Sequence, residues 1–422
     1  MTGTIDPTLL DDLVWRGLVA HSTDLGALRE ALTSESVRFY VGFDPTAPSL
    51  HMGNLVQLVT ARRLQDAGHT PYILVGGATG MIGDPRDSGE RTLNSLDTVK
   101  DWTERVRRQV SPYVELQGPN AATIVNNYDW TASLSTIDFL REIGKHFPVN
   151  RMLQRDVVSR RLESGISFTE FSYVLLQSMD FLNLFRDHGV TLQHGATDQW
   201  GNITAGVELI RRASGGHAHA FVTPLITKPD GTKYGKTEGD ALWLDPEMMS
   251  PYSFHQWWLN VDDSQVGELL RIFTFLGRDD IEALERETKE KPWLRSGQKR
   301  LADEVTALVH GTEETRHAKA AAEALFGGGD LHGLSTTTLS AALREAGSTR
   351  VPTLLPVVDL LVEAGLAKSK GEARRTIAEG GAYMNNVRVE DPEAAPLSSD
   401  LIGGSWLVLR KGKKQFAGVE VG

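Results

Sequence analysis

Short apolar runs alternate with amphipathic segments along the first 245 residues of the chain. Five apolar runs predict strands: RFYVGF (38–43), PYILVGG (71–77), ATIVNN (122–127), GVTLQHG (189–195) and AFVTPLIT (220–227). The intervening segments carry apolar residues at helical spacing and predict helices over 54–67, 95–110, 133–143, 151–162, 170–185 and 200–212. Strands that are apolar on both faces and separated by helices indicate a buried parallel sheet. A doubly wound, Rossmann-like α/β domain is therefore predicted.

The pattern changes after Pro251, where strand signals disappear and Leu, Ala, Glu and Arg recur at helical spacing as far as Phe326. Residues 327–351 are rich in Gly, Ser and Thr, which predicts a linker with at most one short helix. The predicted organisation is an α/β domain over 1–245, a helical domain over 246–326, this linker, and a small α+β domain over 352–422.

Composition narrows the possible functions. The chain has no cysteine, which excludes disulfides, thiolate catalysis and thiolate zinc sites. A formal charge of -11 argues against bulk binding to nucleic acid or an anionic membrane. The N-terminus lacks a basic segment followed by an apolar run, and no apolar stretch approaches the roughly 18 residues of a membrane span. We expect a soluble, cytoplasmic protein.

Charge is unevenly distributed along the chain. From Arg350 to the end there are ten Lys and Arg against nine Asp and Glu, a net charge of +1 that leaves -12 for the rest. The cations cluster in KSKGEARR and RKGKKQF. Such runs are often solvated faces, but the contrast with an acidic body favours a module that binds a polyanion.

The segment YVGFDPTAPSLHMGN (40–54) joins the end of the first strand to the start of a helix. The strand ends at Gly42, and His51 and Asn54 fall on one face of the first helical turn. Free N–H groups and the positive end of the helix dipole suit a phosphate at this position, and Gly53 would admit a nucleotide closely. Taken alone, the motif fits equally well with His51 as a simple helix cap.

The segment GTKYGKT (231–237) resembles the phosphate loop G-x-x-x-x-G-K-[ST] but is one residue short. It also follows the last predicted strand, and the next residues do not predict a strong helix. Lys233 and Lys236 lie three apart around a flexible glycine, and Thr237 adds a hydroxyl. Two such cations could neutralise charge on the leaving group of a triphosphate, so a phosphate clamp of another kind is favoured.

These two motifs resemble the signatures of a known enzyme class. SLHMGN resembles the HIGH signature, and KYGKT the KMSKS signature, of the class I aminoacyl-tRNA synthetases. Four further stretches narrow the resemblance to the bacterial tyrosyl-tRNA synthetase family: YVGFDPTAPSLH, LVGGATGMIGDP, TEFSYVLLQSMDF and GATDQWGNITAG. The resemblance covers essentially the whole chain, and its C-terminal segment resembles the alpha-L RNA-binding fold of a small-subunit ribosomal protein.

Two positions depart from the family pattern. Asn54 stands where HIGH has its second histidine, which keeps a hydrogen-bonding side chain without the imidazole. After Asp84, some relatives carry a lysine, whereas Arg86 or Arg91 is the nearby cation here.

The resemblance implies a two-step ligation. The carboxylate of L-tyrosine attacks the α-phosphate of ATP, and the tyrosyl group then passes from the adenylate to the 3'-terminal adenosine of tRNA(Tyr), releasing AMP. Because the attacking carboxylate already carries charge, positioning and stabilisation of phosphate charge should supply most of the acceleration. ATP would bring Mg²⁺, the sequence shows no carboxylate cluster built to hold it, and no structural metal is expected.

Matching the motifs residue by residue implies the site. The implied catalytic residues are Thr46, His51, Asn54, Lys233, Lys236 and Thr237. The implied ATP contacts are Gly42, Asp44, His51, Gly53, Asp198, Lys233 and Lys236. The implied tyrosine contacts are Tyr40, Asp84, Tyr173, Gln177, Asp180, Gln193 and Gln199. Spacing adds support, since Tyr173, Gln177 and Asp180 share one helical face that would ordinarily be apolar. A polar group satisfied within the core is the alternative for Asp180.

The resemblance also implies a homodimer and a tRNA-binding tail. The implied tRNA contacts are Lys368, Lys370, Arg374, Arg375, Arg410, Lys411, Lys413 and Lys414. Three alternatives remain at this point: a tryptophanyl-tRNA synthetase, which shares the architecture; a non-catalytic RNA-binding factor derived from a synthetase; and a P-loop NTPase.

Overall fold

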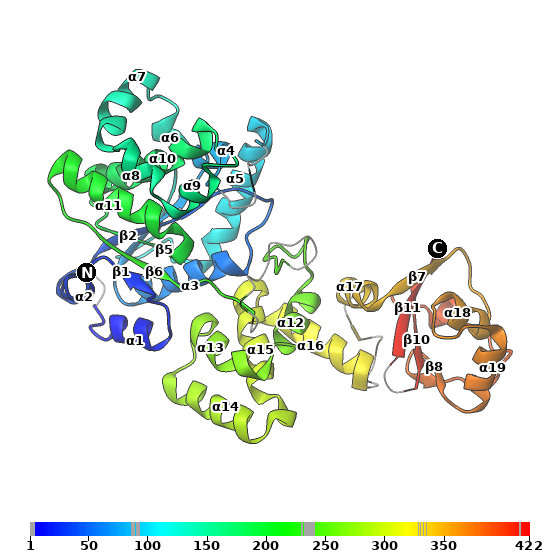
Figure 1. The fold of residues 1–422 in the computed structure, drawn as a ribbon. Helices are drawn as coiled ribbons and strands as arrows, with labels where there is room; N and C mark the ends of the chain where they lie inside the picture. The colour runs from blue at the N-terminus through cyan, green and yellow to red at the C-terminus, as the bar shows by residue number, and fades with distance from the viewer. Residues whose placement is uncertain are drawn as a thin grey trace. The chain divides into compact units, whose positions relative to one another are not determined.

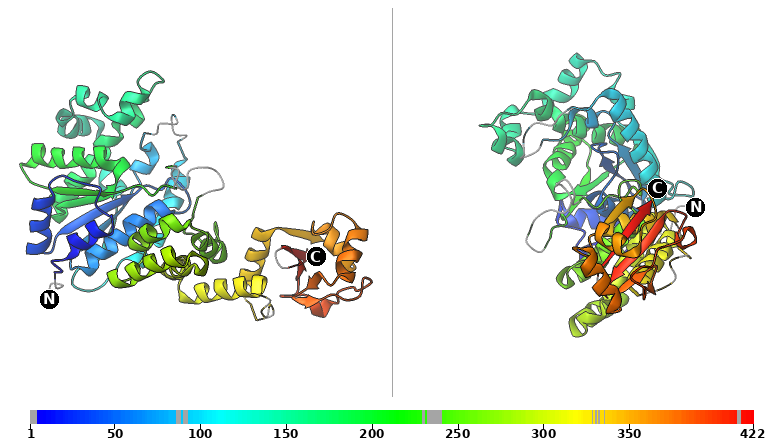
Figure 2. Two further views of the ribbon diagram at one scale, coloured as in Figure 1. Left: turned by 60° about the horizontal axis from the view of Figure 1, so that its bottom comes forward. Right: turned by 90° about the vertical axis from the view of Figure 1, so that its right-hand side faces the viewer.

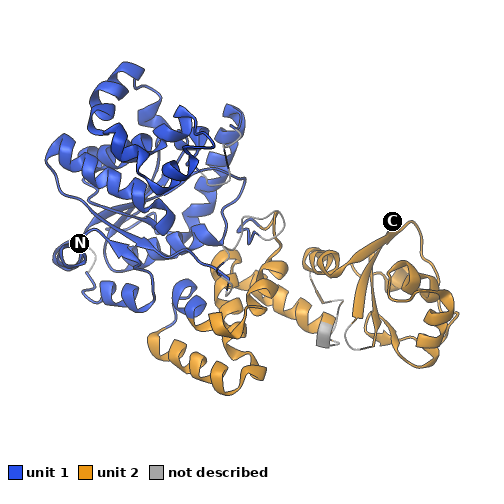
Figure 3. Cartoon of the chain, viewed as in Figure 1, with its two compact units in different colours: residues 1–245, 268–276 blue, residues 246–267, 277–422 orange. Residues whose placement is uncertain are grey.

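The computed structural model describes residues 5–85, 89, 93–228, 231, 241–327, 329, 331, 333–334, 336–412 and 415–422. The chain divides into two compact units, one of residues 1–245 and 268–276 and the other of residues 246–267 and 277–422 (Figure 3). Each unit contains a sheet of its own (Figure 1).

The first unit is built on a six-stranded sheet with the order β1-β6-β5-β2-β3-β4. Its strands are β1 (His21–Ser22), β2 (Arg38–Phe43), β3 (Thr70–Val75), β4 (Thr123–Asn126), β5 (Leu192–Ala196) and β6 (His219–Thr223). β2 to β6 are the five predicted strands and run parallel, which confirms the predicted α/β fold. The two-residue β1 pairs antiparallel with β6 and is too short to leave a sequence pattern.

Helices cover both faces of this sheet: α10 and α11 lie on one side and α3 on the other (Figures 1 and 2). The helices of the unit are α1 (Leu9–Trp15), α2 (Leu25–Ser34), α3 (Met52–Asp66), α4 (Thr79–Ile82), α5 (Leu96–Val110), α6 (Tyr128–Thr131), α7 (Thr136–Asp138), α8 (Val149–Leu153), α9 (Asp156–Arg161), α10 (Phe168–His188) and α11 (Trp200–Ser214). The helix predicted over 151–162 is divided into α8 and α9, because Arg155 has extended backbone (ψ 134°). The helix predicted over 133–143 is α7 continued by a π-helical turn at Phe139–Ile143.

The second unit begins with helices. They are α12 (Pro251–Leu259), α13 (Asp263–Phe273), α14 (Arg278–Glu290), α15 (Ser296–His310), α16 (Thr312–Gly327) and α17 (Thr336–Ala346). α13 crosses the boundary between the units, since residues 263–267 count with the second unit and residues 268–276 with the first. No helix in the described ranges combines the length and apolar character that a membrane crossing requires.

The C-terminal part is a five-stranded sheet with the order β7-β11-β10-β8-β9. Its elements are β7 (Ser348–Val351), α18 (Val357–Glu363), α19 (Lys370–Ala378), β8 (Ala382–Met384), β9 (Val387–Arg388), β10 (Trp406–Lys411) and β11 (Gln415–Val421). β7 pairs in parallel with β11, so it is part of this sheet.

The structure therefore differs from the linker expected over residues 327–351, which contain both α17 and β7. α17 buries Leu339 and Leu343 in an apolar cluster that also contains Tyr252, Ile402 and Trp406. The Gly-, Ser- and Thr-rich composition conceals these few apolar positions. The helical part and the C-terminal sheet of the second unit thus share one apolar core.

Candidate active site

The strand order places a topological switch point between β2 and β5. From β2 the chain proceeds through β3 and β4 on one side and returns to β5 and β6 on the other. In open parallel sheets, ligands bind outside the carboxyl ends of the strands at such a point. Tyr40 on β2 and Gln193 on β5 pair directly across it. Seven of the predicted site residues lie on the segments that follow β2 and β5: Asp44, Thr46, His51, Gly53, Asn54, Asp198 and Gln199.

A carboxylate is buried beside these strands. Asp180 on α10 is 2% exposed, and its two oxygens accept hydrogen bonds from Asn127 Nδ2 at 2.9 Å and Trp130 Nε1 at 2.8 Å. Burial raises the pKa of the Asp180 carboxyl to about 7, although both hydrogen bonds act in the opposite direction. A carboxylate has about four lone-pair sites, so Asp180 retains capacity to accept a hydrogen bond from a buried hydroxyl.

A chain of hydrogen bonds joins Asp180 to a second carboxylate. Asn127 Nδ2 lies 2.9 Å from Thr79 Oγ1, and the Thr79 hydroxyl donates to Asp44 Oδ1 at 2.6 Å. The other oxygen of Asp44 accepts the hydroxyl proton of Tyr173 at 2.6 Å. Burial and the neighbouring Asp44 charge raise the pKa of Tyr173 well above its usual value, which keeps this phenol a neutral donor. These hydrogen bonds hold the carboxylates of Asp44 and Asp180 in fixed positions relative to each other.

Among the residues that the structure describes, three polar side chains near Asp180 carry buried atoms without a hydrogen-bond partner. Within the described part of the chain, Tyr40 Oη, Gln177 Oε1 and Gln193 Oε1 are buried and have no hydrogen-bond partner. Burial, together with the nearby Asp180 charge, raises the pKa of Tyr40 well above its usual value. These three atoms are available to bind a polar ligand together with the remaining acceptor sites of Asp180.

A third carboxylate, Asp84, is held by amides. Gln199 Nε2 donates to one of its oxygens at 2.8 Å and Asn202 Nδ2 to the other at 3.0 Å. The Arg155 guanidinium in turn donates to the amide oxygen of Asn202. Burial raises the pKa of Asp84, and these amides and the Arg155 charge oppose that rise. With carboxylates of Asp44 and Asp84 both close enough to raise the pKa of Tyr173, this end of the site favours a cationic group.

The amino end of α3 has a capping box. His51 Nδ1 accepts the Gly53 N–H at 3.0 Å, and Asn54 Oδ1 accepts the His51 N–H at 3.0 Å. Because Nδ1 is an acceptor, the proton of the neutral imidazole lies on Nε2. His51 therefore caps the helix, and its Nε2 proton lies at the positive end of the helix, where the sequence predicts a phosphate. Asn54 supplies the second half of the cap.

The segment that follows the predicted lysine loop returns to this helix start. Residues 50–52 and 242–244 are joined by backbone hydrogen bonds of 3.0 Å and 2.9 Å. The ring of Trp243 lies edge-on to that of His51, with centroids 6.3 Å apart. The predicted residues Lys233, Lys236 and Thr237, like Arg86 and Arg91, lie outside the described residues. Residues 242–244, the described segment that follows, pair with the start of α3.

Glycines keep space open around this edge of the sheet. A Cβ on Gly53 would lie 2.9 Å from His51 Cε1, and a Cβ on Gly76 would lie 2.0 Å from Asp44 Oδ1. Gly42 is exposed, and a Cβ there would meet only Leu74 Cδ2, at 3.6 Å. The first two positions therefore require glycine for the geometry of their neighbours, whereas Gly42 leaves open surface.

The remaining predicted residues of this unit are more exposed. Thr46 follows the turn after β2 and is exposed, with its N–H donating to the Asp44 carbonyl at 2.9 Å. Asp198 is exposed at the carboxyl end of β5, one residue before Gln199. Across the described ranges, no group of three or more His, Asp or Glu side chains is arranged to hold a metal ion.

The predicted tRNA contacts lie mainly around α19. Lys368, Lys370, Arg374 and Arg375 are exposed, and the guanidinium of Arg410 stacks on Tyr383 with its Cζ 4.4 Å from the ring centroid. Three of the predicted cations form ion pairs: Lys370 with Asp359 at 2.6 Å, Arg374 with Glu393 at 3.4 Å, and Lys411 with Glu372 at 2.7 Å. Lys413 and Lys414 lie outside the described residues. This surface is therefore mixed in charge rather than uniformly basic.

Comparison with known proteins agrees with this geometry. The family model of class I tRNA synthetases (W and Y) matches residues 32–327, and that of the Tyrosine–tRNA ligase SYY-like C-terminal domain matches residues 340–419. The chain is 59% identical to the Tyrosine–tRNA ligase of Streptomyces griseus subsp. griseus, over 98% of this chain and 99% of the relative. The chain belongs to the tyrosine–tRNA ligase family. Identity to the Corynebacterium glutamicum member is 54%, again over 98% of this chain and 99% of the relative.

Solved structures of tyrosyl-tRNA synthetases share the fold. A C-terminally truncated mitochondrial tyrosyl-tRNA synthetase from Aspergillus nidulans is 29% identical with a TM-score of 0.68, covering 75% of this chain and 94% of that chain. The Archaeoglobus fulgidus synthetase complexed with L-tyrosine is 16% identical with a TM-score of 0.56, covering 74% of this chain and 99% of that chain. The family models and the full-length relatives confirm the family assignment made from the sequence motifs.

Sequence reasoning missed several polar residues of this family member's site. They are Thr79, Asn127, Trp130, Arg155 and Asn202, which hold the three carboxylates. A signal for two of them exists, because Asn127 directly follows β4 and Thr79 lies four residues after the end of β3, where parallel sheets place their ligands. Nothing in the sequence indicates which carboxylate each one contacts.

Proposed function

We propose that the chain ligates L-tyrosine to tRNA(Tyr), first forming tyrosyl-adenylate and pyrophosphate from tyrosine and ATP. The observation that carries the proposal is the buried Asp180 carboxylate beside the unmatched hydroxyl of Tyr40. A carboxylate and a phenol held together out of water suit the hydroxyl of a tyrosine side chain. They also disfavour phenylalanine, which has no hydroxyl to offer to Tyr40 or to the remaining acceptor sites of Asp180.

The bound tyrosine extends from Asp180 toward the other carboxylates. Its phenol hydroxyl donates to Asp180, and Tyr40 and Gln193 complete the hydrogen bonds at that end. Its ammonium group lies near Asp84 and Tyr173, with Gln177 and Gln199 beside it. This orientation is favoured because Asp44 and Asp84 both influence Tyr173 electrostatically, which makes this end attractive to a cation.

ATP binds at the amino end of α3. His51 donates from Nε2 to the phosphates, where Asn54, Thr46 and the helix dipole support the same charge. Gly53 and Gly42 leave room for the nucleotide, and Asp198 contacts the ribose, with Asp44 close to the adenylate. Mg²⁺ arrives with the phosphates of ATP as part of the substrate.

The lysine loop completes the phosphate site. Its far end is fixed to the start of α3 by the pairing of residues 242–244 with residues 50–52, so Lys233, Lys236 and Thr237 act from the same edge. As the tyrosine carboxylate attacks the α-phosphate, charge builds on the departing pyrophosphate, and the two lysines stabilise it. The step needs no general base, because the nucleophile is already ionised.

The second step uses tRNA(Tyr) held by the C-terminal part of the chain. The exposed cations around α19, together with Arg410, Lys411, Lys413 and Lys414, contact the phosphate backbone. Three of these cations are paired with carboxylates in the free protein, so tRNA must replace those partners. Binding should also weaken steeply with salt, because each phosphate contact releases counterions from the tRNA. The reaction belongs in the cytoplasm, where tRNA is charged.

The assembly we propose is a homodimer. Large apolar side chains are exposed between residues 137 and 168 of the first unit, including Ile137 at 70%, Val149 at 60% and Phe168 at 71% exposure. Covering them with the same surface of a second copy would remove them from water. Sedimentation of wild type and Phe168→Asp tests this, since the variant should shift toward monomer.

ATP–pyrophosphate exchange with each of the twenty amino acids tests the function. We expect exchange with tyrosine alone, and a loss of about 10²- to 10³-fold in Lys236→Ala with little change in tyrosine binding. Lys289→Ala, an exposed lysine on α14, is the matched control. Exchange driven by tryptophan or phenylalanine, or an unaffected Lys236→Ala, would contradict the proposal.

A further inference from the structure

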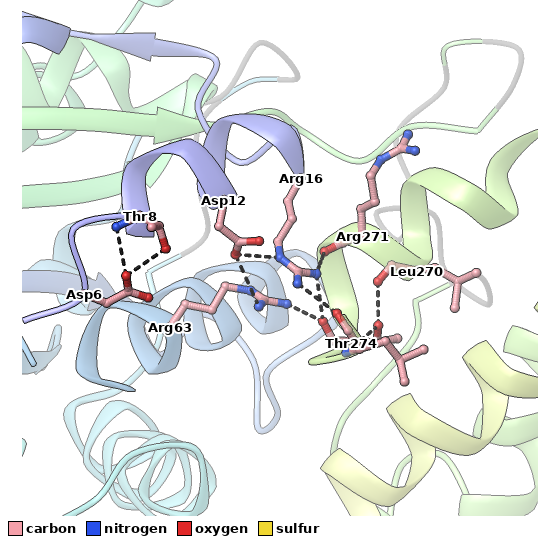
Figure 4. Close-up of polar contacts among 9 residues, drawn as sticks. Asp6, Thr8, Asp12, Arg16, Arg63, Leu270, Arg271 and Thr274 are labelled. Atoms are coloured by element: carbon pink, nitrogen blue, oxygen red, sulfur yellow. Dashed lines mark hydrogen bonds and ion pairs between the residues drawn. The ribbon is translucent and has the colours of Figure 1, made fainter. Parts of the chain in front are cut away.

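Two arginines are buried side by side in the first unit, one just after α1 and the other on α3 (Figure 4). Arg16 follows α1 and is 5% exposed, and Arg63 lies in the last turn of α3 and is 8% exposed. Arginine is almost never buried to this degree unless it is paired. Neither residue belongs to the proposed tyrosine or ATP site.

Both guanidinium groups bind carbonyls at the end of α13. Arg16 Nη1 donates to the Arg271 carbonyl at 2.9 Å and to the Thr274 carbonyl at 3.3 Å, and Arg16 Nη2 donates to the Leu276 carbonyl at 2.9 Å. Arg63 Nη2 also donates to the Thr274 carbonyl. The last carbonyls of a helix have no partner within it, so the two arginines cap α13 from outside. We name Arg16 and Arg63 the arginine clamp.

Capping α13 with the clamp requires the burial of two charged guanidinium groups, which costs desolvation free energy. Asp12 pairs with both arginines, its Oδ2 lying 2.8 Å from Arg16 Nε and 3.9 Å from Arg63 Nη1. Burial and the neighbouring Arg16 charge lower the pKa of Arg63 to about 9. Buried ionic groups often stabilise a fold no better than apolar side chains, whereas in some proteins they specify one arrangement. A glycine or a surface cation would cap a helix at lower cost.

The two helices joined by the clamp have distinct connections. α3 begins at the His51 and Asn54 capping box, about 18 Å along the helix from Arg63. α13 begins at Asp263, among the residues that count with the second unit, and ends at the clamp. Both are continuous helices, so each links the clamp to the residues at its other end.

We propose that the arginine clamp positions α13 for tRNA charging, by holding the helix that enters from the second unit on the helix that binds the phosphates of ATP. The proposal rests on the proposed function, because it assigns tRNA to the second unit. Tyrosine activation uses only residues of the first unit and does not need the clamp. Arg16 and Arg63 are thus positioning residues for the transfer step.

Arg63→Met tests the proposal, since it keeps an unbranched apolar stem and removes the guanidinium. Pyrophosphate exchange and tRNA charging are measured at equal concentrations of titrated active sites. We expect exchange within about twofold of wild type and a fall of about tenfold in kcat/KM for tRNA. Arg63→Lys, which keeps a cation able to donate to the Thr274 carbonyl, should recover most of the charging. Arg62→Met, one residue earlier on α3 and 31% exposed at its side chain, is the matched control.

Phe275→Ala provides a second variant if Arg63→Met does not fold. Its ring lies 4.6 Å from Arg63 Cζ, and the residue is 43% exposed, so removing it loosens the clamp with little loss of core. An equal fall in exchange and charging would show a merely structural role and overturn the proposal, as would unchanged charging in both variants. A wild-type protein that exchanges with tyrosine but fails to charge tRNA would instead contradict the proposed function.

Discussion

Asp180→Asn removes the ionisable group from the proposed tyrosine pocket and keeps the shape of the side chain. Burial raises the pKa of Asp180 from 3.8 to about 7. A carboxyl whose pKa is raised on folding holds its proton more tightly in the folded protein. Its contribution to the free energy of unfolding is therefore fully present below pH 3.8 and is lost as the pH rises through 7.

The size of this loss follows from the shift. About three pKa units at 1.36 kcal/mol each give about 4 kcal/mol over the whole range, of which about 2 kcal/mol falls between pH 5.5 and 8. Asparagine does not titrate, so the stability of Asp180→Asn relative to wild type should rise by about 2 kcal/mol over that interval. Losing the charged acceptor should at the same time lower kcat/KM for tyrosine by roughly 10- to 150-fold.

Urea unfolding at pH 5.5 and 8, with pyrophosphate exchange at the same two values, measures both effects. In wild type, kcat/KM for tyrosine should fall as the pH drops below about 7, because protonated Asp180 no longer accepts the phenol proton. Asp187→Asn, an exposed aspartate on the same helix, is the control. A stability difference that is independent of pH, or normal exchange in Asp180→Asn, would refute the reasoning.

Three further changes test other parts of the first unit. His51→Asn keeps a good helix cap, so we expect an unchanged melting temperature with a fall of about tenfold or more in exchange at limiting ATP; a matching loss of stability would show that His51 acts only as a cap. Gly76→Ala places a Cβ 2.0 Å from Asp44 Oδ1 and should raise the KM for tyrosine, while an unchanged KM would show that Asp44 can move without consequence. Glu170→Gln breaks the buried 3.1 Å pair with Arg161 and should cost about 3–5 kcal/mol in urea unfolding, whereas a cost below about 1 kcal/mol would mean that the pair is solvated.

The sequence predicts the sheet of the first unit well, because its five parallel strands are buried on both faces. Such strands appear as unbroken apolar runs, and β2 and β3 begin and end within two residues of the predicted limits. Helices that bury a continuous face, such as α3 and α10, were predicted for the same reason. The short helices between residues 128 and 161 were predicted less well, because they bury few residues and are set by local backbone geometry.

The candidate site could be predicted only in part. The motifs predict Asp44, Asp84 and Asp180 as carboxylates of the site, and the helical stripe brings Tyr173 to the same face as Asp180. The hydrogen bonds through Asn127 could not be predicted, since they join residues about fifty positions apart whose meeting depends on strand order. Residues that contact a substrate carry a motif, whereas residues that hold those contacts in place are chosen by geometry alone.

The apolar cluster of the second unit bears on how the protein could be shortened. Sequence composition suggests a cut after residue 326, yet that cut would remove Ile402 and Trp406 from the cluster that they share with Tyr252 and Leu325. Burial of one tryptophan removes about 150–250 Å² from water, which corresponds to about 4–6 kcal/mol. A catalytic fragment made this way would expose apolar side chains at its end and would tend to aggregate. Its solubility would depend on polar substitutions at the newly uncovered positions.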